Sequence, residues 1–273
     1  MRLPGGLWIE GGLRRDFAFK PASGAVERAL QAAGQAEACL PDRVTRALSV
    51  SIERIGGAEP NSELTAGLAV GDRQFLMRRL AVHLGLNETW MTSVCRRCGS
   101  PFDYFIDHGR LPVKEAGPGF PFVDVETRRG MIRLRVPGGS EQAAIAGLDD
   151  PESILRILVS RCLVDTPGEA GAKRKFPVDR LDAEDFKRIE SALETTAPEV
   201  TTRVRVECSE CGTGHLIDVD PYLVLGRVGT DLDREIHVIA STYHWSEKDI
   251  LELPTARRKR YLELIDQTAG TGA

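Results

Sequence analysis

The sequence has little of what marks a membrane-bound, secreted or nucleic-acid-binding protein. Its 273 residues contain no apolar run near the roughly 20 residues of a membrane span. Residues 1–20 contain no unbroken apolar segment of signal-peptide type. Lysine and arginine number 36 against 40 aspartate and glutamate residues, so the formal net charge is −4 and there is no basic excess. We therefore expect a cytoplasmic protein that does not bind DNA by bulk electrostatic attraction.

Motifs of the common enzyme classes are absent as well. There is no Gly-x-Ser-x-Gly nucleophile elbow, no phosphate-binding glycine-rich loop and no His-Glu-x-x-His metal motif. The five histidines form no catalytic pattern, and His83, His108 and His215 are expected to be surface or hydrogen-bonded residues. Hydrophobic residues make up 42% of the chain, which is enough for one large or two modest cores. The sequence thus predicts a folded protein that is not an enzyme.

Cysteine is scarce too, but four of the six cysteines fall into two Cys-x-x-Cys-Gly motifs. Such a turn between two strands aims both sulfur atoms at one point, and its glycine permits the positive φ that the turn needs. Two of these zinc knuckles supply the four thiolates that Zn²⁺ prefers in closed structural sites. We therefore predict one structural zinc ion, bound by Cys95, Cys98, Cys208 and Cys211.

The two motifs are far apart for a zinc ribbon, because residues 99–207, 109 in all, separate them. Lengthening the gap from about 17 to about 109 residues costs only roughly 1.7 kcal/mol of loop-closure free energy. Zinc binding can contribute on the order of 10–16 kcal/mol, so a discontinuous ribbon is energetically reasonable. A redox pair, a metal-free pair and local disulfides are the alternatives, and His215 is close enough in sequence to replace a thiolate. Cys39 and Cys162 lie alone in helical patterns and are expected to pack as small apolar residues.

The chain also shows a weak internal repeat. With the two cysteine motifs aligned, an offset of 113 residues pairs Asp72 with Asp185 and places apolar residues opposite one another. The offset changes to 110 near Pro41 and to 116 near Leu7, and a longer loop at Thr166–Pro177 accounts for the first change. A chance alignment of amphipathic segments is the alternative. The apolar pairs are Leu68 with Leu181, Leu76 with Ile189 and Leu80 with Leu193.

Periodicity and turn residues predict the same succession of elements in both halves. A hairpin is followed by three helices and then by two short strands that flank a cysteine motif. The helices are expected at about 24–38, 42–55 and 70–84, and again at about 140–147, 151–164 and 182–196. We predict an α+β fold with three parts. Residues 1–112 and 113–222 are two copies of a hairpin-plus-helices unit joined by the zinc ribbon, and a helical segment follows at 223–273.

The C-terminal segment is predicted to form three short helices. Residues 231–243 have apolar side chains at helical spacing, Ser246 can cap a second helix, and Pro254 opens a third. Such a cluster can be a helix-turn-helix reader of DNA, with its basic run on phosphates, or a protein-docking platform. The net acidic charge favours docking. The expected partner-binding residues are Trp245, which can also act as a hydrophobic staple, together with Arg257, Arg258 and Tyr261.

Part of this segment resembles a known family. The residues are Arg234-Glu235-Ile236-His237, Tyr243-His244-Trp245-Ser246-Glu247, Asp249-Ile250-Leu251, Arg257-Arg258 and Tyr261-Leu262-Glu263-Leu264. Together they resemble the C-terminal signature of the baseplate hub assembly chaperones of T-even phage type, which are encoded with contractile phage tails and related contractile injection systems. The segment Gly71-Asp72-Arg73 and the Cys-x-x-Cys-Gly motif also look similar, and the resemblance covers roughly residues 20–265.

The resemblance implies a non-enzymatic factor that helps to assemble a baseplate hub or spike protein and need not remain in the finished particle. Its expected partner is that hub or spike protein, with no membrane, nucleic acid or small-molecule substrate. The zinc prediction rests on the cysteines alone. The alternative function is a zinc-ribbon DNA-binding regulator that uses the C-terminal helices.

Overall fold

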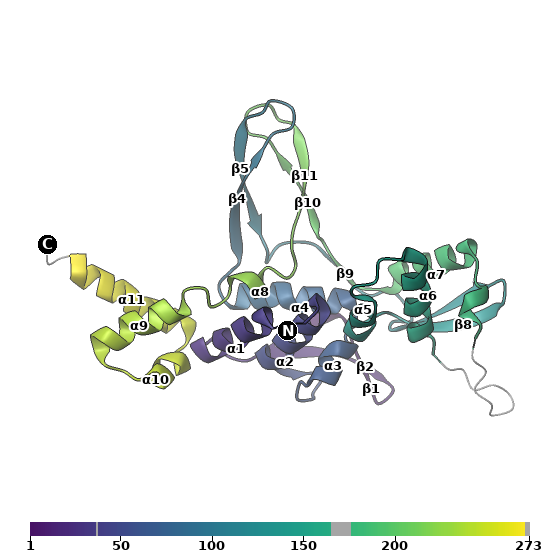
Figure 1. Ribbon diagram of the computed structural model, residues 1–273, viewed down its shortest axis with the longest axis horizontal. Coiled ribbons are helices and arrows are strands. Elements are labelled where there is room, and N and C mark those ends of the chain that lie inside the picture. The colour runs from purple at the N-terminus through teal and green to yellow at the C-terminus, as the bar shows by residue number, and fades with distance from the viewer. Residues whose placement is uncertain (37, 165–175, 271–273) are drawn as a thin grey trace.

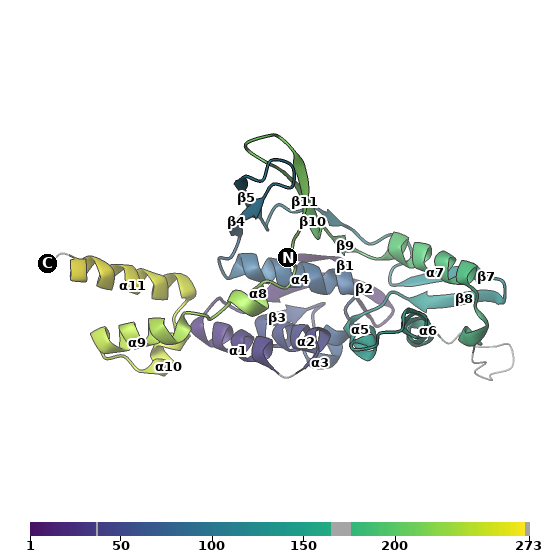
Figure 2. The ribbon, with the colours of Figure 1, turned by 45° about the horizontal axis from the view of Figure 1, so that its top comes forward.

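The chain forms an elongated molecule from which a pair of hairpins projects (Figure 1). A computed structural model describes residues 1–36, 38–164 and 176–270. The first half of the chain lies at the centre, the second half at one end and the C-terminal helices at the other (Figure 2). Helices and strands both contribute, so the predicted mixed α+β class is confirmed. No helix in the described ranges is long and apolar enough to cross a membrane.

The first half is built on an antiparallel sheet of β1 (Arg2–Ile9), β2 (Gly12–Phe19) and β3 (Ile52–Ile55). Its helices are α1 (Gly24–Gln35), α2 (Leu40–Ser51), α3 (Ser62–Gly67) and α4 (Val70–His83). Ser23 caps α1 by accepting from the Val26 amide, which is one of the donors that a helix start leaves without an intrahelical partner. Fully buried apolar side chains from strands and helices form one core, among them Leu3, Leu30, Leu48, Ile52, Leu76 and Leu80.

Residues 52–55 differ from the prediction. The sequence pattern extends a helix to residue 55, but α2 ends at Ser51 and the next four residues form β3. Ile52 and Ile55 are fully buried, and the segment pairs with β2 beside Phe19 and Phe17. The open edge of the hairpin supplies main-chain partners that helical periodicity does not reveal, so a long-range pairing overrides the local preference.

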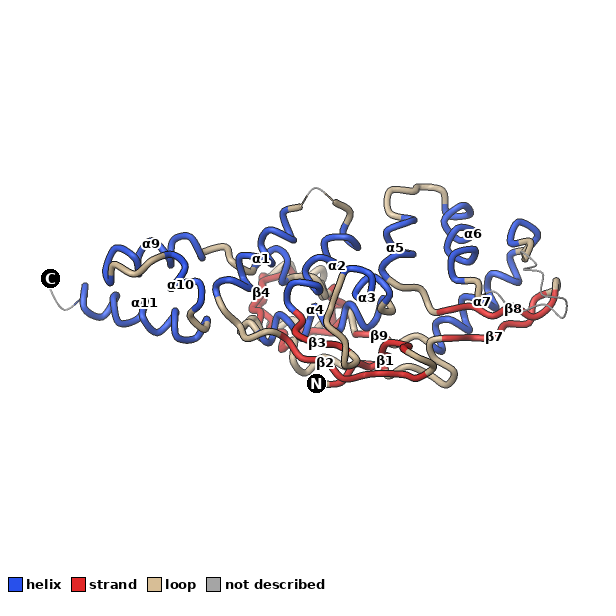
Figure 3. Tube along the Cα trace, turned by 90° about the horizontal axis from the view of Figure 1, so that it is seen from below, coloured by secondary structure: helices blue, strands red, loops and turns tan. Residues whose placement is uncertain are grey.

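The second half has a similar order of elements. Its hairpin consists of β7 (Phe122–Thr127) and β8 (Gly130–Arg135), and the helices are α5 (Gly139–Ile145), α6 (Pro151–Cys162), the 3₁₀ helix η1 (Val178–Arg180) and α7 (Ala183–Thr196). After α6 the chain returns to β8, where Leu163 bridges Leu134, much as β3 returns to β2. Figure 3 shows α1, α2, α5 and α6 on the same side of the two hairpins. The loop predicted at Thr166–Pro177 lies almost entirely outside the described residues.

The two halves meet at Gly71 and Arg73 near the start of α4, and Asp72 between them binds α4 to β1 of the first half. Gly71 lies so close to the chain after α7 that a Cβ atom there would overlap the carbonyl oxygen of Pro198. The Asp72 carboxylate accepts hydrogen bonds from two amides of β1, at 2.7 and 2.9 Å. The fully buried guanidinium of Arg73 donates to three oxygen atoms of the first half, and Gly139 of α5 lies directly against it.

Replacing Gly71 by alanine is expected to destabilise the protein by at least about 2 kcal/mol, because the Cβ atom must displace main chain rather than a flexible side chain. Gly67 is a matched control. It is the last residue of α3, and a Cβ atom there would meet nothing within 4 Å. Gly67→Ala should be neutral or slightly stabilising. Urea unfolding of both variants checks the prediction, and equal effects at the two positions would contradict it.

The carboxyl group of Asp72 should make stability depend on pH. Burial raises its pKa to about 6, although the Gly5 and Gly6 amides act in the opposite direction. The pKa of Asp72 is higher in the folded than in the unfolded protein. Its contribution to the free energy of unfolding is therefore fully present below the unfolded pKa and is lost as the pH rises through about 6. Between about pH 4.5 and about pH 7.5 the loss amounts to roughly 2 kcal/mol.

Asp72→Asn isolates this contribution, since the other titrations are common to both proteins. The amide removes one acceptor, so the variant should be less stable than the wild type at low pH. The difference in unfolding free energy should shrink by roughly 2 kcal/mol over the same pH range. Urea unfolding at both pH values measures it, and a difference that stays constant would show that Asp72 does not titrate in this interval.

The C-terminal helices have a core of their own. The helix α8 (Val224–Arg227) packs on the first half. The helices α9 (Leu232–Tyr243), α10 (Glu247–Glu252) and α11 (Thr255–Gly270) follow and enclose a separate apolar cluster. The Ser246 hydroxyl accepts a hydrogen bond from the Asp249 amide at 3.2 Å, as the predicted cap requires. The three predicted C-terminal helices are therefore confirmed.

Candidate metal centre

Two antiparallel hairpins rise side by side from the centre of the molecule (Figure 1, Figure 2). One consists of β4 (Glu88–Val94) and β5 (Pro101–Asp107), and the other of β10 (Arg203–Glu207) and β11 (Gly214–Asp218). Just before β10, the strand β9 (Glu199–Val200) pairs with β6 (Val113–Lys114). Alternate side chains of the facing strands form an apolar core between the hairpins, including Phe102, Tyr104, Ile106, Val204, Val206 and Ile217.

Both hairpins end in the same kind of turn. The amides of Gly99 and Gly212 donate to the carbonyl oxygens of Cys95 and Cys208, at 2.9 Å in each turn. The two glycines have φ angles of 74° and 69°, in the left-handed region that side chains with a Cβ atom disfavour. The two Cys-x-x-Cys-Gly motifs therefore fold into equivalent turns, as their sequence predicts.

The four cysteine sulfurs of these turns lie together. All four are within 4.8 Å of one another, with Cys95 and Cys211 Sγ 3.6 Å apart and Cys98 and Cys208 Sγ 3.8 Å apart. In a tetrahedral site with Zn–S bonds of about 2.3 Å, neighbouring sulfurs are about 3.8 Å apart. None of the four forms a disulfide. The donor set fits a tetrahedral metal ion, and the predicted convergence of the four cysteines is confirmed.

Hydroxyl side chains next to the turns act on the thiols. The Cys211 sulfur is 3.2 Å from the Thr213 hydroxyl, and hydrogen bonding with this residue lowers the pKa of Cys211 to about 6. The Ser100 main-chain amide, followed by its hydroxyl, lowers the pKa of Cys98, whereas burial raises the pKa of Cys208 to about 11. A bound cation favours the thiolate form of all four cysteines.

Sequence reasoning missed Ser100 and Thr213. Each is a hydroxyl residue two positions after the second cysteine of its motif, and this shared position is the signal that could have found them. His215, the histidine nearest to a knuckle, lies beside the cluster, with its Nε2 atom 3.3 Å from the Cys95 sulfur. Its ring packs against Phe102 at a centroid distance of 5.2 Å. His215 thus contacts the four-cysteine cluster from outside it.

The residues predicted to bind a partner lie in different environments. Trp245 and Tyr261 are partly buried, and their rings meet edge to face with centroids 5.0 Å apart. Tyr243 completes this ring cluster. Arg257 is exposed and lies over the Tyr261 ring. Arg258, in contrast, is only 1% exposed, so the prediction of a surface contact through it is corrected.

Arg258 is buried because it joins α11 to two other helices. Its Nη2 atom donates to the Glu27 carboxylate of α1 at 2.5 Å, and its Nε atom donates to Glu235 of α9 at 2.6 Å. The Thr255 hydroxyl also donates to Glu27. These partners are far away in the sequence, so the basic run around Arg258 gave no sign of them.

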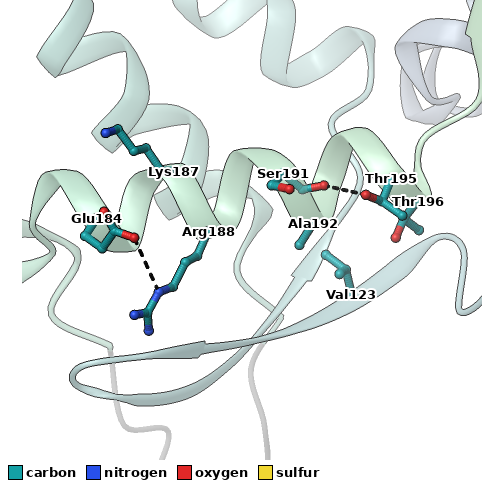
Figure 4. Close-up of a pocket in the computed structure, with 8 residues that line it drawn as sticks. All are labelled: Val123, Glu184, Lys187, Arg188, Ser191, Ala192, Thr195 and Thr196. Atoms are coloured by element: carbon teal, nitrogen blue, oxygen red, sulfur yellow. Dashed lines mark hydrogen bonds and ion pairs between the residues drawn. The ribbon is translucent and has the colours of Figure 1, made fainter.

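The surface groove along α7 holds no catalytic grouping (Figure 4). It has a volume of about 520 Å³ and lies between α7 and Val123 of β7. Its polar groups interact along the helix itself: Arg188 is 4.0 Å from Glu184, and the Thr195 hydroxyl donates to the Ser191 carbonyl at 2.7 Å. Among the residues that line this groove, no nucleophile is paired with a base.

Comparisons with protein-family models, with curated proteins and with solved structures find no match for the chain. The four-cysteine cluster and the C-terminal helices are therefore interpreted from their own residues.

Proposed function

We propose that the protein is a non-enzymatic assembly chaperone for the baseplate hub of a contractile phage tail-like injection system, acting in the cytoplasm. The observation that supports this is the arrangement of the residues that resemble the chaperone signature. Glu235 pairs with Arg258, and Tyr243, Trp245 and Tyr261 form one ring cluster. The signature residues thus hold one helical unit together, so the similarity concerns a connected structure rather than scattered positions.

The body of this chaperone is proposed to be two copies of one unit pinned by a single structural zinc ion. Besides the equivalent knuckles, Asp72 on α4 and Asp185 on α7 support the duplication. Each carboxylate accepts hydrogen bonds from the hairpin main chain of its own half, Asp72 from β1 and Asp185 from the Arg128 amide at 2.9 Å. A closed shell of four thiolates leaves no open coordination position for a substrate, which favours a structural role.

The basic run of α11 gives less support to a DNA-binding regulator. Arg258 is buried in ion pairs, and Arg260 lies 2.8 Å from the Glu263 carboxylate. Arg257 lies over the Tyr261 ring. Few of these cations are therefore free to neutralise phosphates, which is the interaction that dominates DNA affinity.

Deletion of the gene in a strain that produces the contractile apparatus tests the proposal. Assembled particles should be lost and should return when the gene is supplied again, and the hub protein should co-purify with this chain from cells that express both. Normal particle yield without the gene would contradict the chaperone function. Sequence-specific, salt-sensitive DNA binding without a hub interaction would favour the regulator instead.

A further inference from the structure

The β4–β5 hairpin presents an apolar face to solvent. Trp90 lies opposite Phe105 and Val94 lies opposite Pro101, on the side away from the core that the two hairpins share. Trp90 is 71% exposed, Val94 62% and Phe105 41%, and the two rings are 5.2 Å apart. Neither the metal centre nor the core between the hairpins uses these side chains. A contiguous exposed aromatic pair of this kind is typical of an interaction site.

The charges on the same face have one sign. The two strands carry Glu88, Asp103 and Asp107 but no lysine or arginine. None of these three carboxylates takes part in an ion pair of the described residues. Arg96 and Arg97 belong to the metal-binding turn beyond the end of β4. The aromatic pair is therefore surrounded on its own strands by unneutralised negative charge, which a basic partner surface would complement.

We propose that this β4–β5 face, formed by Glu88, Trp90, Thr92, Val94, Pro101, Asp103 and Phe105, is the surface that binds the client protein. The inference rests on the proposed chaperone function and specifies its partner as a hub-protein surface with an apolar socket bordered by lysine or arginine side chains. Binding energy concentrates in a few accessible aromatic anchors. Trp245 and Tyr261 are already packed within their own core, whereas Trp90 and Phe105 form a ring pair that is exposed to solvent.

Binding of the purified full-length chain to the purified hub protein, measured by calorimetry, tests the surface. The double variant Trp90→Ser with Phe105→Ser should weaken binding roughly a hundredfold or more. The variant Glu88→Lys with Asp103→Lys should weaken it about tenfold and remove most of its salt dependence. Leu216→Ser is the matched control, because Leu216 is 64% exposed on the outer face of the other hairpin. It should leave the affinity unchanged.

Zinc content and circular dichroism should be the same for all variants, which shows that the hairpins are intact. Equal hub binding by the wild type and the aromatic double variant would overturn the assignment of this face while leaving the chaperone function in place. Absence of hub binding by the wild type would overturn both. A wild-type dimer in sedimentation that becomes monomeric in the aromatic double variant would identify a second copy as the occupant and would also overturn the proposal.

Discussion

Cys208→Ser is expected to abolish metal binding and to unfold the pair of hairpins. The wild type should contain one zinc ion per chain, because its four sulfurs are spaced for a single tetrahedral site. Structural zinc supplies on the order of 10–16 kcal/mol of binding free energy, far more than the small apolar core between the hairpins can replace. Elemental analysis measures the zinc, and amide hydrogen exchange over residues 88–107 and 203–218 measures the unfolding.

The effect should be confined mainly to the hairpins. The cores of the two halves are separate from the hairpin core, and the contacts of Gly71 and Arg73 join the halves independently of the metal. Cys39→Ser is a matched control, since the Cys39 thiol donates to Asp42 and lies outside the four-cysteine cluster. It should keep one zinc ion per chain. Two zinc ions in the wild type, or a full complement in Cys208→Ser, would contradict the shared site.

Arg258→Met is expected to destabilise the docking of the C-terminal helices by about 3–5 kcal/mol. The substitution removes the cation from two carboxylates, and the one on Glu27 has a side chain that is only 8% exposed. A buried charge without its partner costs far more than an exposed one. Urea unfolding, combined with hydrogen exchange of α9 to α11, should show these helices opening before the rest of the molecule.

Two further variants separate the buried ion pair from general effects of charge. Arg257→Ala removes the neighbouring exposed arginine and should change stability by no more than about 0.5 kcal/mol. Combining Glu27→Leu with Arg258→Met replaces this pair by apolar side chains and should recover most of the loss, because the more deeply buried of the two uncompensated carboxylates is gone. A double variant no more stable than Arg258→Met would show that packing, rather than the buried charge, explains the effect.

Local patterns in the sequence were enough to predict much of the fold. Helical periodicity placed α1, α4, α6, α7 and α9 within a few residues, and the Ser246 cap predicted the start of α10. Each Cys-x-x-Cys-Gly motif predicted its own turn. These features depend on interactions between residues a few positions apart, so a short stretch of the sequence is enough to predict each of them.

Contacts between distant residues required the folded structure. Residues 52–55 became a strand because the β2 edge was available, and Arg258 was buried because Glu27 of α1 lies beside it. The exposure of Trp90 likewise depends on which face of β4–β5 meets the second hairpin. The cysteine cluster was predictable across the long gap only because zinc needs four ligands and each motif supplies two. No fixed number of ligands determines which residues form an ion pair or which strands pair. Their partners can therefore be identified only in the folded structure.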